Sequence, residues 1–174
     1  MRIRIVISTL ALLALGLTLS PSPVAAAPLC FGQEATIEGE PGDEIITGTP
    51  GPDVIVGLGG DDEIHGLGGN DRICGNENRD NLFGEGGADR IDGGAAIDDM
   101  DGGAEDDVLR AGGGNPCEEC TNIVYGRDGA DRLIGGPDKD VLFGGEGNDV
   151  IDGNGDVDGC RGGPGADTIR DCEL

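Results

Sequence analysis

Residues 144–152 read GGEGNDVID, and residues 162–170 read GGPGADTIR. Both stretches begin with glycines, place aspartate sixth and place an aliphatic residue eighth. The same nine-residue pattern recurs outward from them along the chain, and its first clear unit is GTPGPDVIV, which begins at Gly48. A fixed short period of this kind indicates stacked structural repeats and not an ordinary globule.

The register extends over most of the sequence. Fifteen units, together with a six-residue insertion within 111–125, account for residues 30–170, and the first two units (30–38 and 39–47) are degenerate. Twelve units have aspartate at the sixth position: Asp53, Asp62, Asp71, Asp80, Asp89, Asp98, Asp107, Asp131, Asp140, Asp149, Asp158 and Asp167. Acidic, aromatic-poor chains are often disordered, but a disordered chain does not keep such a register.

Each unit is predicted to form half a turn of a solenoid. Glycine permits the positive φ of a tight turn, and the last three residues form a short strand with one side chain inward, as in Val54-Ile55-Val56. Two units complete one coil, so strands eighteen residues apart stack in parallel about 4.8 Å from each other. Collagen is excluded because glycine recurs every nine residues and not every three.

Stacking brings the sixth-position residues into two ladders. The first contains Asp53, Asp71, Asp89, Asp107, Asp131, Asp149 and Asp167; the second contains Glu44, Asp62, Asp80, Asp98, Asn122, Asp140 and Asp158. Carboxylates about 5 Å apart repel each other by about 3 kcal/mol at an effective dielectric constant of about 20. Lys139 is the only lysine, so no lysine ladder offsets this repulsion.

A cation between successive turns would reverse the repulsion. Carboxylates and turn carbonyls are hard oxygen ligands that suit Ca²⁺, whereas Mg²⁺ demands stricter geometry. Zinc prefers His and Cys ligands, and His65 is the only histidine. The twelve aspartates are therefore the predicted ligands of several calcium ions. With so few apolar side chains per unit, folding is expected to be coupled to calcium.

The two ladders are expected to differ in occupancy. Glycine stands at the fourth position of most units in the first ladder, whereas the second ladder has Asn78, Ala96 and Asp138 there and also takes the insertion. We expect tighter and fuller occupancy on the first ladder. Six intervals per ladder limit the sites to about twelve.

These residues resemble the RTX, or hemolysin-type calcium-binding, repeat family, whose consensus is GGxGxDxUx. Residues 144–152 and 162–170 match it in full, and the resemblance covers nearly all of the chain after residue 26. It implies an all-β parallel β-roll, a right-handed solenoid of nine-residue half-turns with calcium in the turns. Two departures matter: no catalytic or pore-forming domain fits in the chain, and the export signal is amino-terminal.

Residues 1–26 are predicted to be a cleaved signal peptide, which leaves a repeat domain over 27–174 and makes the protein secreted and extracellular. Arg2 and Arg4 precede an apolar run that is too short to span a membrane and that ends before small residues. Six cysteines fit an oxidising exterior. Fifteen pairings are formally possible. The proposed pairing is Cys30–Cys74 and Cys160–Cys172 at the two ends, with Cys117–Cys120 in the inserted loop.

Several functions are disfavoured. The formal net charge of −24 opposes nucleic-acid binding. All three serines lie in the predicted signal peptide, so a Ser-His-Asp site cannot form and no enzyme is expected. Arginines such as Arg72, Arg90 and Arg132 are expected to offset the acidic field, and their scatter argues against a binding groove. A structural or matrix role is favoured; the alternatives are an adhesion module that uses the 111–125 loop and a non-catalytic accessory to a secreted enzyme, for example in binding polysaccharide.

Overall fold

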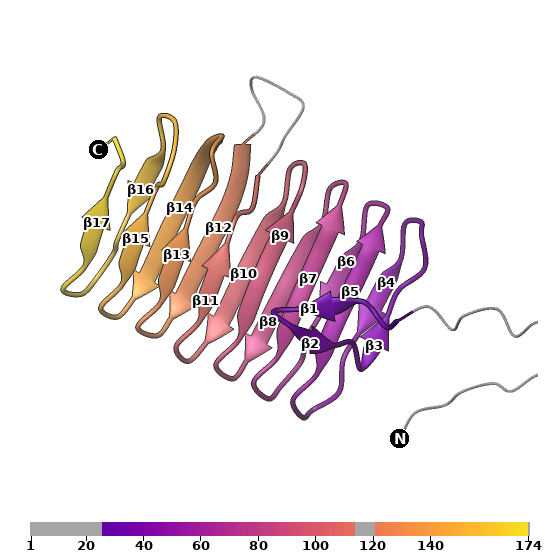
Figure 1. Cartoon of the computed structure of the whole chain (residues 1–174). Helices are drawn as coiled ribbons and strands as arrows, with labels where there is room; N and C mark the ends of the chain where they lie inside the picture. Colours follow the sequence, from indigo (N-terminus) through magenta and orange to yellow (C-terminus); the bar gives the residue numbers. More distant parts are fainter. Residues whose placement is uncertain (1–25, 114–120, 174) are drawn as a thin grey trace, which may run out of the picture.

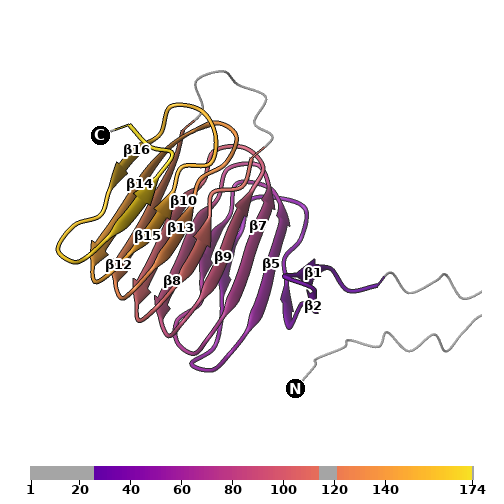
Figure 2. The same ribbon diagram turned by 60° about the vertical axis from the view of Figure 1, so that its left-hand side comes forward.

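The computed structural model describes residues 26–113 and 121–173. In these residues every regular element is a β-strand. Two parallel sheets face each other, and the chain alternates between them as it advances along one axis (Figures 1 and 2). The predicted all-β parallel β-roll is confirmed.

The larger sheet has eight strands, which all belong to units of the first ladder or to the degenerate first unit. They are β3 (Ile37–Glu38), β5 (Val54–Gly59), β7 (Arg72–Glu77), β9 (Arg90–Gly94), β11 (Val108–Arg110), β13 (Arg132–Ile134), β15 (Val150–Asp152) and β17 (Thr168–Arg170).

The smaller sheet has seven strands, from the units of the second ladder. They are β4 (Ile45–Thr47), β6 (Glu63–His65), β8 (Asn81–Gly86), β10 (Asp99–Ala104), β12 (Thr121–Asp128), β14 (Lys139–Glu146) and β16 (Gly159–Arg161).

The pairing register follows the repeat. Ile55 pairs with Ile73, eighteen residues later, as two nine-residue units require. Across the insertion Met100 pairs with Val124, so the six extra residues are accommodated without shifting the strands. Because a shift of one residue would turn every inward side chain outward, the eighth-position pattern holds this register.

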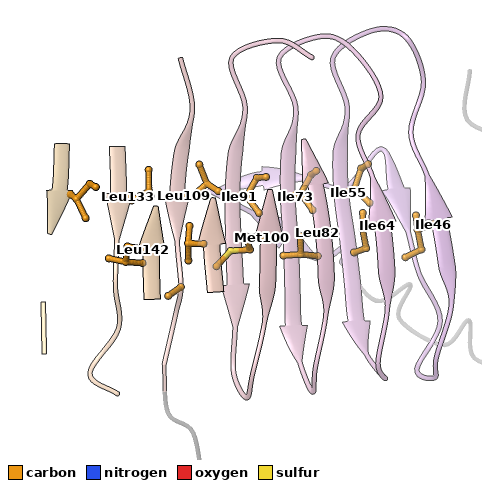
Figure 3. Close-up of a cluster of buried hydrophobic side chains, with 13 residues drawn as sticks. Ile46, Ile55, Ile64, Ile73, Leu82, Ile91, Met100, Leu109, Leu133 and Leu142 are labelled. Atoms are coloured by element: carbon orange, nitrogen blue, oxygen red, sulfur yellow. The ribbon is translucent and has the colours of Figure 1, made fainter. Parts of the chain in front are cut away.

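The core is a double row of eighth-position side chains between the two sheets. Ile55, Ile73 and Ile91 project from one sheet toward Ile64 and Leu82 on the other (Figure 3). Nearly all of these side chains are fully buried. With one inward residue per unit, the core is one side chain deep on each sheet.

Several strands are longer than the predicted three residues. β5 continues through Leu58 and Gly59, which pair with Asn76 and Glu77 of the next coil. Leu58 and Asn76 both have positive φ, at 80° and 79°. The turns stack on each other in register, so backbone pairing extends into them.

The first degenerate unit is not a regular half-turn. Instead, β1 (Leu29–Cys30) and β2 (Gln33–Glu34) form an antiparallel hairpin, which lies across the outer face of the larger sheet at one end (Figure 1). Cys30 is bonded to Cys74 of β7, and the hairpin buries the outward-facing Val54 and Val56. Two valines facing outward leave an apolar patch, and the hairpin covers it.

The predicted Cys30–Cys74 and Cys160–Cys172 disulfides are both present. The predicted signal peptide and the Cys117–Cys120 bridge lie outside the described residues. Within 26–113 and 121–173, no helix could cross a membrane.

Candidate metal centre

The sixth-position residues stand directly before the strands, where each turn enters a sheet. They form two columns, which contain the same residues as the two predicted ladders. The first column runs beside the larger sheet and the second beside the smaller sheet. Eleven of the twelve predicted aspartates are buried; Asp167, in the last coil, is half-buried. The structure thus brings all twelve into the two expected alignments.

One oxygen of each carboxylate is used by the fold. The backbone N–H of Asp71 donates to Oδ1 of Asp89 at 2.8 Å, and the N–H of Asp89 donates to Oδ1 of Asp107 at 2.8 Å. The same bond recurs down the second column, for example from Asp62 to Asp80 at 2.9 Å. Each aspartate therefore ties its own coil to the preceding one.

In most of these aspartates the other oxygen has no partner. In nine of these aspartates Oδ2 is buried and accepts no hydrogen bond: Asp62, Asp71, Asp80, Asp89, Asp98, Asp107, Asp131, Asp149 and Asp158. A buried carboxylate oxygen without a partner is costly, and native proteins contain few of them. Nine such oxygens in two columns are a repeated feature that a bound cation would satisfy.

First-position glycines leave the space beside these oxygens open. A methyl group on Gly66 would lie 2.5 Å from Oδ2 of Asp71 and 2.9 Å from the carbonyl oxygen of Gly84. On Gly57 it would lie 2.7 Å from Oδ2 of Asp62 and 2.8 Å from the carbonyl oxygen of Gly75. The first-position glycine of one coil therefore lies beside its own carboxylate and the carbonyl of the next coil.

Burial also makes the metal-free carboxylates weak acids. Loss of hydration, with a smaller contribution from neighbouring carboxylates, raises the pKa of Asp107 to about 8 and of Asp80 and Asp98 to about 7. The pKa rises to about 6 at four further positions: Asp71, Asp89, Asp131 and Asp158. The backbone hydrogen bond to Oδ1 only partly opposes this shift. The columns hold protons tightly when no cation is bound.

This donor set fits calcium. Within the described residues no three Asp, Glu, His or Cys side chains gather tightly enough to hold a metal by themselves. Main-chain carbonyl oxygens also lie in these turns, beside the first-position glycines, and Ca²⁺ accepts carboxylate and carbonyl oxygens together in flexible geometry. The predicted combination of carboxylates and turn carbonyls is compatible with the structure.

Asn122 interrupts the second column. Its side-chain oxygen accepts the N–H of Asp98 at 2.8 Å, as an aspartate would. Its amide nitrogen donates to Oδ1 of Asp140 at 2.8 Å, and Oδ2 of Asp140 accepts the N–H of Gly136. Both oxygens of Asp140 therefore accept hydrogen bonds, unlike the nine aspartates whose Oδ2 has no partner.

The first column is closed at its amino-terminal end by a residue that the repeat pattern did not single out. Thr49 donates from its backbone N–H and its hydroxyl to Oδ2 of Asp53, at 2.7 and 2.8 Å. The signal was a threonine at the second position, where most other units have glycine or another residue without a side-chain hydroxyl.

Comparison with protein families gives one match. Six segments match the family described as RTX calcium-binding nonapeptide repeat (4 copies), at residues 38–73, 68–100, 75–109, 93–115, 121–151 and 134–169. Together these segments cover most of the chain and include all twelve aspartates. No curated protein matches the chain closely enough to count as a relative.

Proposed function

Because the chain belongs to the RTX calcium-binding nonapeptide repeat family, we propose that it acts outside the cell as a non-catalytic, structural β-roll whose folding is coupled to calcium. The repeats and the parallel solenoid support calcium binding by a β-roll.

The observation that supports the ligand assignment is the set of buried Oδ2 atoms without partners in both columns. We assign the twelve sixth-position aspartates as side-chain ligands and the carbonyls of the glycine-rich turns as the remaining ligands. Calcium would supply the positive charge that these oxygens lack. The aspartates themselves set the spacing, because each Oδ1 bond holds two successive coils together.

The extracellular location is supported by the two disulfides, since such bonds persist in oxidising compartments. Calcium sites of extracellular modules bind at about 10⁻⁴–10⁻³ M. A chain tuned to that range would stay unfolded at low calcium and fold after export.

A structural role is supported by the uniformity of the coils. A carboxylate pair that catalyses needs two unlike environments, whereas most aspartates of each column share one bonding pattern. The apolar row between the sheets is packed along its length. We therefore assign no catalytic residue.

Calorimetric titration of Asp89→Asn with CaCl₂ tests the ligand assignment. Asparagine keeps the acceptor for the N–H of Asp71 but removes the charge, so we expect at least one calcium ion fewer per chain. Asp101→Asn is the matched control, because Asp101 lies on the outer face of the smaller sheet and pairs with Arg127. Equal calcium stoichiometry in both variants would contradict the assignment.

A further inference from the structure

Five arginines that are scattered in the sequence gather on one face of the molecule. Arg72, Arg90 and Arg132 follow sixth-position aspartates, and Arg110 and Arg170 stand at ninth positions, all on strands of the larger sheet. Their strands alternate with a buried residue in the middle, so the arginines face outward. The arginines are scattered in the sequence, but the eighteen-residue coil brings them onto one sheet face.

This arginine face is cationic on a strongly acidic protein. The outward-facing residues of this sheet are the seventh and ninth residues of each unit. Among them are the five arginines and three acidic residues, Glu38, Asp92 and Asp152. The outer face of the smaller sheet has one arginine, Arg161, against three acidic residues at the equivalent positions. The two faces therefore carry opposite net charge, while the whole chain carries −24.

Within the described residues, none of the five arginines forms an ion pair. The ion pairs in that part of the chain involve the smaller sheet and its turns, for example Arg79–Asp99 at 3.8 Å and Arg127–Asp101 at 2.6 Å. The Nε of Arg90 is buried and has no hydrogen-bond partner. Arg110 and Arg170 stand opposite Asp92 and Asp152 on the neighbouring strands. Arg72, Arg90 and Arg132 have only valine or arginine opposite them, so the face keeps an excess of positive charge.

The hairpin orders part of this face. The ring of Phe31 lies 4.5 Å from the guanidinium carbon of Arg90 and 5.8 Å from that of Arg110. Such cation–π contacts hold a guanidinium in place. The Cys30–Cys74 bond fixes the hairpin to the sheet, so these arginines are positioned before any ligand arrives.

The shape of the face selects a narrow ligand. Strands such as β11 and β13 have three residues, which gives a width of about 10 Å. A linear polymer lying across the strands meets an arginine on every strand from β7 to β17 except β15. A nucleic-acid duplex is much wider, and its second strand would be repelled by the aspartate-bearing turns on both sides.

We propose that the arginine face binds a linear anionic polysaccharide, whose carboxylate or sulfate groups are contacted by Arg90, Arg110, Arg132 and Arg170. Guanidinium groups recognise such groups through paired hydrogen bonds. The inference depends on the proposed function in one respect, since calcium assembles the solenoid and neutralises the turns that flank the face.

The test compares two triple variants in calcium. Arg110→Gln/Arg132→Gln/Arg170→Gln removes three exposed arginines from the face, and Arg79→Gln/Lys139→Gln/Arg161→Gln removes the same charge elsewhere. Binding to immobilised dextran sulfate is measured, with uncharged dextran as the blank. We expect the first variant to bind about tenfold more weakly than the wild type or worse, and the second to stay within about twofold.

Circular dichroism of each calcium-loaded variant separates the two proposals. A wild-type chain that fails to fold in calcium contradicts the proposed function. If the wild type folds but does not bind dextran sulfate, the polysaccharide site alone is overturned. Equal binding by the two triple variants has the same meaning. Tighter binding to duplex DNA than to dextran sulfate would also overturn it.

Discussion

At the scale of the residue, each column aspartate makes two different contributions. Oδ1 accepts a backbone N–H from the neighbouring coil, which an asparagine can also do, as Asn122 shows. Oδ2 is buried without a partner in nine of the aspartates, and a cation or a proton would supply one. The sixth position is thus structural through one oxygen, and the other oxygen is the one that we propose binds calcium.

Acid should partly replace calcium. Because burial raises the pKa of Asp107 to about 8 and of Asp80 to about 7, the folded state binds protons more tightly than the unfolded state. Each such carboxyl destabilises the metal-free fold as the pH rises from about 4 through its folded pKa. We expect the metal-free chain to have most strand signal near pH 4–5 and to lose it by about pH 8. Circular dichroism of the metal-free chain across this range measures the effect, and equal strand content at both ends would refute it.

Asn122→Asp should create calcium binding where the second column is interrupted. The amide that donates to Asp140 would be replaced by a charged oxygen, so the calcium stoichiometry should rise by one or two ions and the metal-free chain should become less stable. Titration calorimetry measures the stoichiometry. Asn148→Asp is the control, because Asn148 is exposed and only accepts the N–H of Ala166. A stoichiometry unchanged from the wild type would show that Asn122 does not block a site.

At the scale of the element, the half-turn requires glycine where the chain passes a carboxylate. Gly66→Ala would place a methyl group 2.5 Å from Oδ2 of Asp71, inside the space proposed for calcium. Gly68→Ala, in the same turn, would meet nothing closer than 3.8 Å. We expect the first substitution to lower the free energy of unfolding of the calcium-loaded chain by about 1–3 kcal/mol and the second to have little effect.

Chemical denaturation in calcium compares the two alanine variants. If both variants lose the same stability, the first-position glycines are required for backbone conformation and not to leave space for calcium. Calcium affinity, measured in parallel, should fall only in Gly66→Ala.

The sequence allowed much of the element-level structure to be predicted. The period of nine and the eighth-position residues were sufficient for the half-turn, the eighteen-residue stacking and the double row that contains Ile55 and Ile64. The hairpin at Leu29–Glu34 was not foreseen, because a degenerate unit keeps the spacing of a repeat without its glycines. The Cys30–Cys74 bond that anchors it was predicted as a hypothesis among fifteen formal pairings, and it is present.

The sequence also identified the aspartates of the site but not how they bond. The sixth position of the repeat indicates that a carboxylate faces its neighbours. Which oxygen accepts the backbone N–H and which has no partner depends on the exact backbone geometry, which the sequence does not give. The role of the Asn122 amide and the gathering of Arg90, Arg110 and Arg132 became visible only after the coils were stacked.

At the scale of the whole molecule, the solenoid has a thin core and two long columns of buried acid. The apolar row is one side chain deep on each sheet, and the columns oppose folding wherever their oxygens are ionised and unpaired. Each coil contacts only its neighbours, so occupation of one interval favours the next. Calcium uptake and folding should therefore be cooperative and should occur together.

A calcium titration of the metal-free chain at pH 7.5, followed by far-ultraviolet circular dichroism, tests this claim most directly. The account predicts little strand signal before calcium, a cooperative rise with several ions bound per chain, and reversal by a chelator; magnesium at the same concentration should not substitute. A full strand signal in the metal-free chain, with no calcium uptake at millimolar supply, would contradict it.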